Sequence, residues 1–214
     1  MQSYYAARAG EYDRVYQKPE RQSDLRQIEQ WLPALLSGAT VLELACGTGY
    51  WTRFIAPVAS AVVAIDSAPE TLRIARQRVN ASNVRFQIGD AYALSPAGRS
   101  FDAAFAGFWF SHVPLERQHG FLAGLNSALA PGARVVLLDN LFVEGSSSPV
   151  AEQDGNGNTY QCRTLSDGST HRVLKNFPDE VQLRALAAQG LGERAAYRRW
   201  QYYWAFEYRV AGHA

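Results

Sequence analysis

The sequence predicts an α/β fold built on a mostly parallel sheet with helices on both faces. Apolar, β-prone runs alternate with helical patterns, a glycine loop follows the first run, and the second and third runs end in a carboxylate. The expected core strands begin at Val41, Val62, Val84, Phe101 and Ala133. Strands that alternate with helices imply βαβ units, and therefore a parallel sheet.

The loop after the first strand carries two glycines, Gly47 and Gly49, and the strand itself carries Glu43. Glycine lets the backbone turn tightly and lets a ligand approach without a Cβ in its way. The loop therefore predicts the first βα turn of a Rossmann-like nucleotide-binding sheet. The dinucleotide fingerprint needs a third glycine where Thr52 stands, and no Gly-Lys-Ser/Thr is present, which excludes a phosphate-cradling P-loop.

This pattern resembles the first motif, E/D-x-x-x-G-x-G, of the class I S-adenosylmethionine-dependent methyltransferases. The match consists of Glu43, Ala45, Gly47 and Gly49. The resemblance implies S-adenosylmethionine as the cofactor. It also implies the Rossmann-like class I methyltransferase fold, a seven-stranded, mostly parallel sheet whose last strand is antiparallel. Because this cofactor has no phosphate, the loop must supply a close-packed backbone floor rather than a full anion-binding turn.

Further cofactor positions follow in the order of that family. Asp66 ends the second strand, and an ionised carboxylate has two oxygens that accept from both hydroxyls of a ribose. The resemblance implies that Asp66 holds the ribose, Asp90 the adenine amino group and Ala91 an adenine nitrogen, while residues 106–108 line the methionine end. The expected cofactor-binding residues are Arg8, Tyr12, Glu43, Ala45, Gly47, Gly49, Trp51, Asp66, Ser67, Asp90, Ala91, Gly107 and Phe108.

Several of these residues have plainer interpretations. Asp66 precedes a helix that Pro69 begins, so it could be a helix cap. Asp90 could be a turn acid. Cys46 is expected to be a small buried residue rather than a nucleophile, because free cysteine packs well in cores and no activating partner is evident.

Composition restricts the classes of partner. The chain of 214 residues fits one domain, divided into a helical lid (1–36), a cofactor-binding core (37–140) and a substrate-cap loop with a C-terminal hairpin (141–214). Its 21 basic and 20 acidic residues leave a net charge of +1, without the basic stripe that nucleic-acid enzymes show. Neither cysteine nor carboxylate spacing suggests a metal site. No run is long enough to span a membrane and no signal segment is present, so we expect a cytoplasmic monomer or homodimer.

Segments on both sides of the core are expected to form the acceptor site. The tyrosine-rich start of the chain, followed by a helix over 20–36, resembles the lid of small-molecule methyltransferases. Tyr12 and Arg8 are then cofactor contacts, and Tyr4 and Tyr5 are pocket walls; packing on the sheet edge is the alternative.

After the core, helices are expected over 115–129 and 179–188, the second ending at Gly190, with a turn at Pro131–Gly132. A hairpin over 160–165 and 171–175 and two last strands near 193–199 and 202–208 complete the chain. The loop over 144–158 and this hairpin are interpreted as a substrate cap, although such a loop could also have no functional role.

Methyl transfer from a sulfonium is an in-line displacement that depends mainly on proximity and orientation. A base is needed only if the acceptor carries an O–H or N–H proton. His112 follows the fourth strand at the carboxyl edge of the sheet and is the first candidate; ordering the loop is the alternative role. The expected substrate contacts are Tyr4, Tyr5, Trp109, His112 and His171.

The run Phe108–Phe110 suggests a flat or apolar acceptor, although some of its members could belong to the core. Together with Ser111–Pro114 and the segments 165–168 and 173–177, it resembles methyltransferases of the UbiE-like or type 11 sort, whose members methylate O, N, S or C atoms. We therefore expect a methyltransferase that acts on a small, planar or aromatic metabolite. A non-catalytic cofactor-binding or scaffold subunit is the alternative. An oxidoreductase lacks its third glycine here, and an aminopropyl transferase lacks its aspartate-rich acceptor site.

Overall fold

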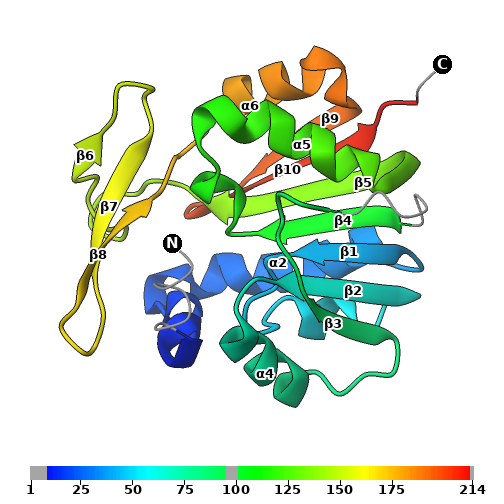
Figure 1. Ribbon diagram of the computed structural model, residues 1–214, viewed down its shortest axis with the longest axis horizontal. Coiled ribbons are helices and arrows are strands. Elements are labelled where there is room, and N and C mark those ends of the chain that lie inside the picture. Colours follow the sequence, from blue (N-terminus) through cyan, green and yellow to red (C-terminus); the bar gives the residue numbers. More distant parts are fainter. Residues whose placement is uncertain (1–8, 95–100, 213–214) are drawn as a thin grey trace.

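Seven strands form the central sheet of the computed structural model, which describes residues 9–94 and 101–212 (Figure 1). Their order is β3-β2-β1-β4-β5-β10-β9, and β10 runs antiparallel to both of its neighbours. This is the predicted fold, with one antiparallel strand at the end of the chain. The strands are β1 (Thr40–Leu44), β2 (Ala61–Asp66), β3 (Val84–Ile88), β4 (Phe101–Gly107), β5 (Leu129–Asn140), β9 (Gly192–Arg199) and β10 (Tyr203–Val210).

The strand order reverses at β1, which pairs in parallel with β2 on one side and with β4 on the other. In open α/β sheets ligands bind at the carboxyl ends of the strands at such a reversal, because the connections diverge there. The glycine loop, Asp66, Phe108 and Asn140 lie at or just beyond the ends of β1, β2, β4 and β5. The topology therefore collects them at one edge of the sheet.

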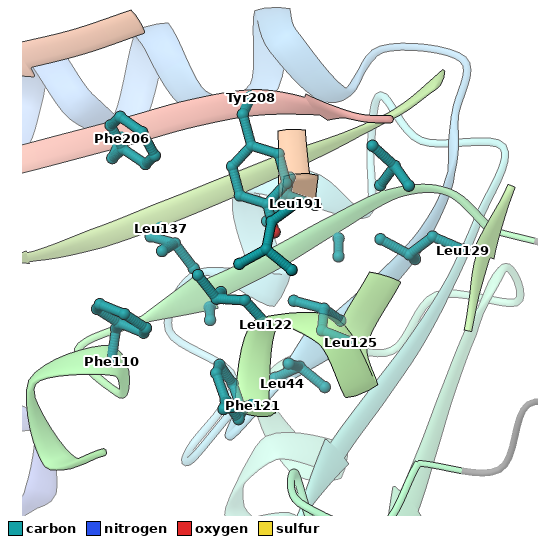
Figure 2. Packing of buried hydrophobic residues seen from close by; sticks show 14 of the residues in the cluster. Leu44, Phe110, Phe121, Leu122, Leu125, Leu129, Leu137, Leu191, Phe206 and Tyr208 are labelled. Carbon is teal, nitrogen blue, oxygen red and sulfur yellow. The ribbon is translucent and has the colours of Figure 1, made fainter. Parts of the chain in front are cut away.

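Helices cover both faces of the sheet. One face holds α2 (Gln22–Leu36), α3 (Thr52–Ile55) and α4 (Pro69–Arg78), and the other holds α5 (Gln118–Ser127) and α6 (Glu180–Leu186). The buried face of α2 presents four fully buried side chains at helical spacing, Leu25, Ile28, Leu32 and Leu36. Figure 2 shows the opposite layer, in which Phe121, Leu122 and Leu125 of α5 pack with residues of the sheet.

Two predicted boundaries around the fifth strand were wrong. The expected helix over 115–129 is a 3₁₀ turn, η4 (Leu115–Arg117), followed by α5, which ends at Ser127. The expected turn at Pro131–Gly132 lies inside β5 instead, where Gly132 has a φ of +76°. The pairing register with β4 shifts between Phe101 and Ala103. The glycine conformation thus bends the strand without ending it, as a β-bulge does.

Residues 141–178 form a separate unit beside the carboxyl edge (Figure 1). It contains a small antiparallel sheet of β6 (Glu152–Gln153), β7 (Thr159–Thr164) and β8 (Thr170–Leu174). The predicted hairpin is confirmed, whereas β6 lies in a stretch that was expected to be loop. The chain then enters α6 through a capping box of Asp179 and Gln182. A π turn, η5 (Ala187–Leu191), ends the helix at Gly190, which has a φ of +84°.

The described part of the chain has no helix that is long and apolar enough to cross a membrane. Within the same residues, no three histidine, cysteine or acidic side chains gather in a way that could hold a metal ion.

The packing of β9 on β10 yields a stability prediction. A Cβ on Gly192 would lie 2.2 Å from Cδ2 of Tyr208, a ring that is 1% exposed. Gly192→Ala should therefore lower the free energy of unfolding by about 1–3 kcal/mol, through overpacking. Gly124→Ala is the matched control, because nothing lies within 4 Å of the added Cβ on this helical residue. It should be neutral or stabilising by up to about 1 kcal/mol in urea unfolding. Equal stabilities of the two variants would contradict the packing argument.

Candidate active site

The glycine loop after β1 is held in an unusual backbone conformation. Ala45, Gly47 and Gly49 have φ values of 48°, 55° and 74°, in the left-handed region that glycine enters at little cost. A Cβ on Gly49 would lie 3.1 Å from Cβ of Ala75, so the loop lies directly against α4. The loop backbone therefore carries no Cβ at 47 and 49, as the predicted cofactor floor requires.

Asp66 ties this loop to the end of β2. Its Oδ2 accepts from the Gly47 N–H at 2.8 Å, and its Oδ1 accepts from the Ala68 N–H at 2.9 Å and the Thr71 hydroxyl at 3.1 Å. Ala68 and Thr71 lie at the start of α4, so Asp66 also has the helix-capping role that was the alternative to ribose binding. Each carboxylate oxygen has two lone pairs, so these bonds are compatible with ribose binding, which stays a prediction.

Glu43 lies in the core directly beneath the loop. Its side chain is 1% exposed, and its Oε2 has no hydrogen bond in the described part of the chain. Burial, with a smaller contribution from Asp66, raises the pKa of Glu43 to about 8, against a lowering effect of Thr52. An orphaned buried acceptor costs about 1–3 kcal/mol. A ligand that brings an N–H donor or a positive charge to this oxygen would remove the cost.

The predicted adenine positions follow β3. Asp90 is exposed and its Oδ1 accepts from the Tyr92 N–H at 2.9 Å, which is the turn role proposed as the alternative. The Ala91 N–H donates no hydrogen bond within the described residues, so it is available to an acceptor atom of a ligand. Ser67 is exposed at the end of β2.

The end of β4 is strained. Phe108 has a φ of 57° while its N–H donates to the Leu138 carbonyl at 2.7 Å. A non-glycine residue in this conformation costs about 1–3 kcal/mol, and such residues gather at functional sites. The preceding Gly107 leaves no room for a side chain, because a Cβ would lie 2.9 Å from the Phe105 ring and 3.0 Å from Trp51. The Trp51 side chain is thus buried against Gly107, and its predicted contact with the cofactor stays a prediction.

The N-terminal segment lies against the glycine loop. In the 3₁₀ helix η1 (Ala9–Tyr16), Asp13 accepts from the Thr48 hydroxyl at 2.6 Å and forms an ion pair with Arg78. Tyr16 stacks on Tyr50 with ring centroids 3.5 Å apart. The role of this segment as a lid stays a prediction. Tyr4, Tyr5, Arg8 and the side chain of Tyr12 lie outside the described residues, so their predicted contacts stay predictions.

A cavity of about 360 Å³ opens beside the ends of β4 and β5, between the N-terminal segment and the small sheet. Of the predicted site residues, it contains Phe108 and His112. Its lining is rich in cations and hydroxyl groups: Arg14, Val15, Lys18, Arg21, Phe108, His112, Asn140, Ser146, Ser147, Ser148, Gln161, Cys162, Arg163, Thr164, Leu165, Lys175 and Phe177.

His112 lies in the wall of this cavity and is 4% exposed. It belongs to a 3₁₀ turn, η3 (Phe110–His112). Its Nδ1–H donates to the Leu174 carbonyl at 2.5 Å, which fixes the tautomer with the lone pair on Nε2. Burial and the charges of Lys175 and Arg163 hold the pKa of His112 well below its ordinary value. His112 is therefore neutral at physiological pH and is a weak base.

A buried ion pair behind His112 was not found from the sequence. The Lys175 ammonium contacts Asp139 Oδ1 at 2.5 Å and donates to the Ser111 hydroxyl at 2.6 Å, while the Ser111 N–H donates to Asp139 Oδ2 at 3.1 Å. The Lys175 and Asp139 side chains are 4% and 0% exposed. Burial lowers the pKa of Lys175; it would raise that of Asp139, but Lys175 holds that pKa below its usual range. The sequence signal that could have indicated this ion pair is Asp139, an acid near the end of a predicted strand.

Of the predicted substrate contacts that the structure describes, Trp109 and His171 do not line this cavity. Trp109 packs edge-on against Tyr92, with centroids 5.9 Å apart. Phe110 is fully buried in the layer of Figure 2. The Nε2 of His171 lies 2.9 Å from the Ser169 hydroxyl near the tip of the hairpin. Cys46 is buried, and burial raises the pKa of its thiol, as expected for a structural residue.

Comparisons with known proteins agree with this geometry. A family model described as a methyltransferase domain matches residues 41–132. DhpI, solved in complex with SAH, is 31% identical, with a TM-score of 0.81 and coverage of 99% of this chain and 96% of that chain. The chain belongs to the class I S-adenosylmethionine-dependent methyltransferases. A DhpI complex with SAM and HEP is 32% identical, with a TM-score of 0.80 and coverage of 96% and 94%.

Curated relatives of this methyltransferase family match over shorter stretches. The ubiquinone biosynthesis O-methyltransferase of Xanthomonas axonopodis pv. citri is 34% identical over 153 residues, 70% of this chain and 60% of that protein. The demethylmenaquinone methyltransferase of Lactiplantibacillus plantarum is 34% identical over 112 residues, 49% and 46% of the two chains. The chain thus spans roughly half the length of the curated relatives that it matches.

The buried carboxyl of Glu43 predicts a pH dependence of stability. Because its pKa is raised from 4.5 to about 8, the folded protein keeps a proton that the unfolded chain releases. This contribution to stability is complete below about pH 4.5, decreases as the pH rises, and is lost above about pH 8. Glutamine does not titrate, so Glu43→Gln should lose less stability than wild type over this window.

Urea unfolding at several pH values measures this difference. Glu70→Gln, a change of an exposed acid on α4, is the control and should follow wild type. Parallel profiles of wild type and Glu43→Gln would contradict the assignment.

The Lys175–Asp139 pair gives a second prediction. Lys175→Met leaves the Asp139 charge buried and uncompensated, which should cost about 3–5 kcal/mol of unfolding free energy. Adding Asp139→Asn removes that charge, so the double variant should be more stable than Lys175→Met alone. A double-mutant cycle in chemical denaturation measures the coupling, and additive effects of the two substitutions would show that the pair is not coupled.

Proposed function

We propose that the chain transfers a methyl group from S-adenosylmethionine to a small-molecule acceptor held in the cavity. The observation that carries this proposal is the placement of Phe108 and His112. They follow β4, next to the β1 loop that is expected to hold the cofactor, and they also line a cavity large enough for a metabolite. The names of the similar methyltransferases for quinone substrates support an acceptor of this size class.

The residues at the ends of β1, β2 and β3 fit the cofactor. The unbonded Oε2 of Glu43, the left-handed glycines of the loop, Gly47 and Gly49, and the unbonded Ala91 N–H are features that a ligand would complete. We assign the ribose hydroxyls to Asp66 and the adenine ring to Asp90 and Ala91. When bound, S-adenosylmethionine supplies a methyl group that is already activated on a sulfonium. The protein then has to orient the two reactants and exclude water.

We propose that His112 positions the acceptor and does not act as a strong general base. Its low pKa supports this role, since a proton taken up at Nε2 would be buried among cations. The Nδ1–H bond to the Leu174 carbonyl fixes the orientation of the ring in the wall of the cavity. An acceptor that needs no deprotonation, or that loses its proton to water, suits this arrangement.

The non-catalytic alternative predicts a filled acceptor pocket, and the cavity of about 360 Å³ argues against it. The similar protein DhpI has been solved with both SAM and HEP. By analogy, we propose that this chain also binds its cofactor together with a second small molecule. A planar acceptor has less support, because only Phe108 of the run Phe108–Phe110 lines the cavity. Cytoplasmic location and a monomeric or homodimeric state stay predictions of the sequence.

Calorimetric titration of S-adenosylmethionine, and of its demethylated product, tests the cofactor assignment. Wild type should bind both ligands, and Asp66→Asn should bind them at least about 10-fold more weakly, because one acceptor oxygen toward the ribose is replaced by a donor. Glu70→Gln changes an exposed acid on α4, the helix that follows Asp66, and should bind like wild type. The Tm of Asp66→Asn shows whether the loop is still folded. Failure of the folded wild type to bind either ligand would refute the proposed function.

A further inference from the structure

Basic side chains predominate over acidic ones in the lining of the cavity. Its lining contains five basic residues, and among the described residues that line it none is aspartate or glutamate. The basic residues are Arg14, Lys18, Arg21, Arg163 and Lys175. The whole chain is almost balanced, with 21 basic and 20 acidic residues. This concentration therefore does not follow from composition. It results from the meeting of the N-terminal segment with the small sheet.

Three of these cations are fixed by bonds to neutral oxygens. Lys18 donates to the Ser146 carbonyl. Arg21 donates to the Ser146 hydroxyl at 3.0 Å and to Asn140 Oδ1 at 2.8 Å, and Arg163 donates through Nε and Nη2 to Gln161 Oε1. A guanidinium has five N–H donors, so both arginines keep further donors beyond these bonds. The bonds orient the charges without neutralising them.

Among the described residues, the carboxylates of Asp139 and Glu20 lie close to this group. Asp139 is buried behind the cavity and pairs with Lys175. Glu20 is exposed, and its carboxylate accepts from the Ser146 hydroxyl. Within the described residues, Lys18, Arg21 and Arg163 form no salt bridge. Burial and the neighbouring Arg21 lower the pKa of Lys18, against a raising effect of Glu20, as expected for crowded cations.

The remaining lining suits a compact polar ligand. The hydroxyl groups of Ser147, Ser148 and Thr164 lie in the same wall, and Phe108 and Phe177 are the aromatic members. Partly buried charges are screened less by salt than exposed ones. A neutral or cationic acceptor would leave the cationic repulsion in place, whereas an anion would relieve it.

We propose that the acceptor is a small organic acid whose oxyanion, a carboxylate or a phosphate-type group, binds to Lys18, Arg21 and Arg163. Only the role of the bound acid as the methyl acceptor rests on the proposed function. The anion site itself is inferred from the residues that line the cavity. Charge-assisted hydrogen bonds from arginine to such oxygens are the strong ones, because the planar fork matches two oxygens at once. The other end of the acid would then lie toward Phe108 and His112, on the side of the cofactor loop. The acid group thus determines substrate specificity.

Binding of simple anions tests the site without a known substrate. Inorganic phosphate and acetate, with acetamide as the neutral match of acetate, are titrated into the full chain at constant ionic strength. At least one anion should bind and raise the Tm, while acetamide should not. Removing one charged donor should weaken binding about 10-fold or more in Arg163→Gln and in Lys18→Gln. Arg73→Gln, an exposed cation on α4 outside the cavity, should leave it unchanged.

The outcomes separate the possible ligands. Binding of phosphate alone assigns the site to phosphate-type acids, and binding of acetate extends it to carboxylic acids. The proposal is overturned if neither anion binds, if acetamide binds as well as acetate, or if Arg73→Gln loses as much affinity as Arg163→Gln. Because S-adenosylmethionine binding is measured separately, a failure of the anion site is distinguishable from a failure of the proposed function.

A panel of paired acceptors tests the same assignment by turnover. Each small acid is offered beside its amide, with labelled S-adenosylmethionine as the methyl donor. Acids should be methylated in preference to amides, and Arg163→Gln should raise KM about 10-fold or more while kcat changes little, because the lost contact is made in both ground and transition states. Equal transfer to amides and acids would contradict an anionic acceptor.

Discussion

The pairing of β1 with both β2 and β4 is the constraint on which the site depends. The loop after β1 leads to α3 on one face of the sheet, and the loop after β4 leads to α5 on the other face. The two loops therefore diverge and leave a crevice at the carboxyl edge between these strands. The bond from the Gly47 N–H to Asp66 then fastens the β1 loop to the end of β2. On the other side, the Phe108 N–H fastens the β4 turn to Leu138 of β5. Cofactor positions and cavity are thereby placed on neighbouring strands.

The cavity depends on a second structural element, because the central sheet supplies only one of its walls. The small sheet supplies another, and the buried pair of Lys175 with Asp139 joins it to β5. The Leu174 carbonyl, one residue earlier, accepts from His112. Burying two charges is costly unless hydrogen bonds satisfy them. Here Ser111 bonds to both members of the pair, so the same contacts that hold the small sheet in place also fix the loop after β4.

The sequence allowed the cofactor half of the site to be predicted, because its signals are local. Two glycines, an acid on the strand before them and an acid at the end of the next strand stand at fixed spacings. The acceptor half was not predictable in this way. Its cations come from residues 14–21, 163 and 175, and no periodicity links these segments. Only the docking of the small sheet brings them together.

Local backbone strain also decides where the aromatic rings after β4 lie. The run Phe108–Phe110 was interpreted as suggesting a flat or apolar acceptor, with some of its members in the core. The left-handed conformation of Phe108 and the 3₁₀ turn after it break any alternation. Phe108 then lies at the cavity, Trp109 against Tyr92, and Phe110 in the core. Gly132 is a similar case. A turn was expected there before the fifth strand, but β5 continues through the left-handed conformation of this glycine.

The N-terminal segment joins the two halves. Asp13 bonds to Thr48 of the glycine loop, whereas Arg21 bonds to Asn140 and Ser146 beside the cavity. Between them the chain runs mostly as 3₁₀ turns, whose hydrogen bonds are weaker than those of an α-helix. Its position therefore depends on these side-chain contacts rather than on its own helical stability. The N-terminal segment thus lies against the glycine loop and also supplies cations to the cavity. The proposed cofactor and acceptor sites would therefore share a wall that tertiary contacts hold in place.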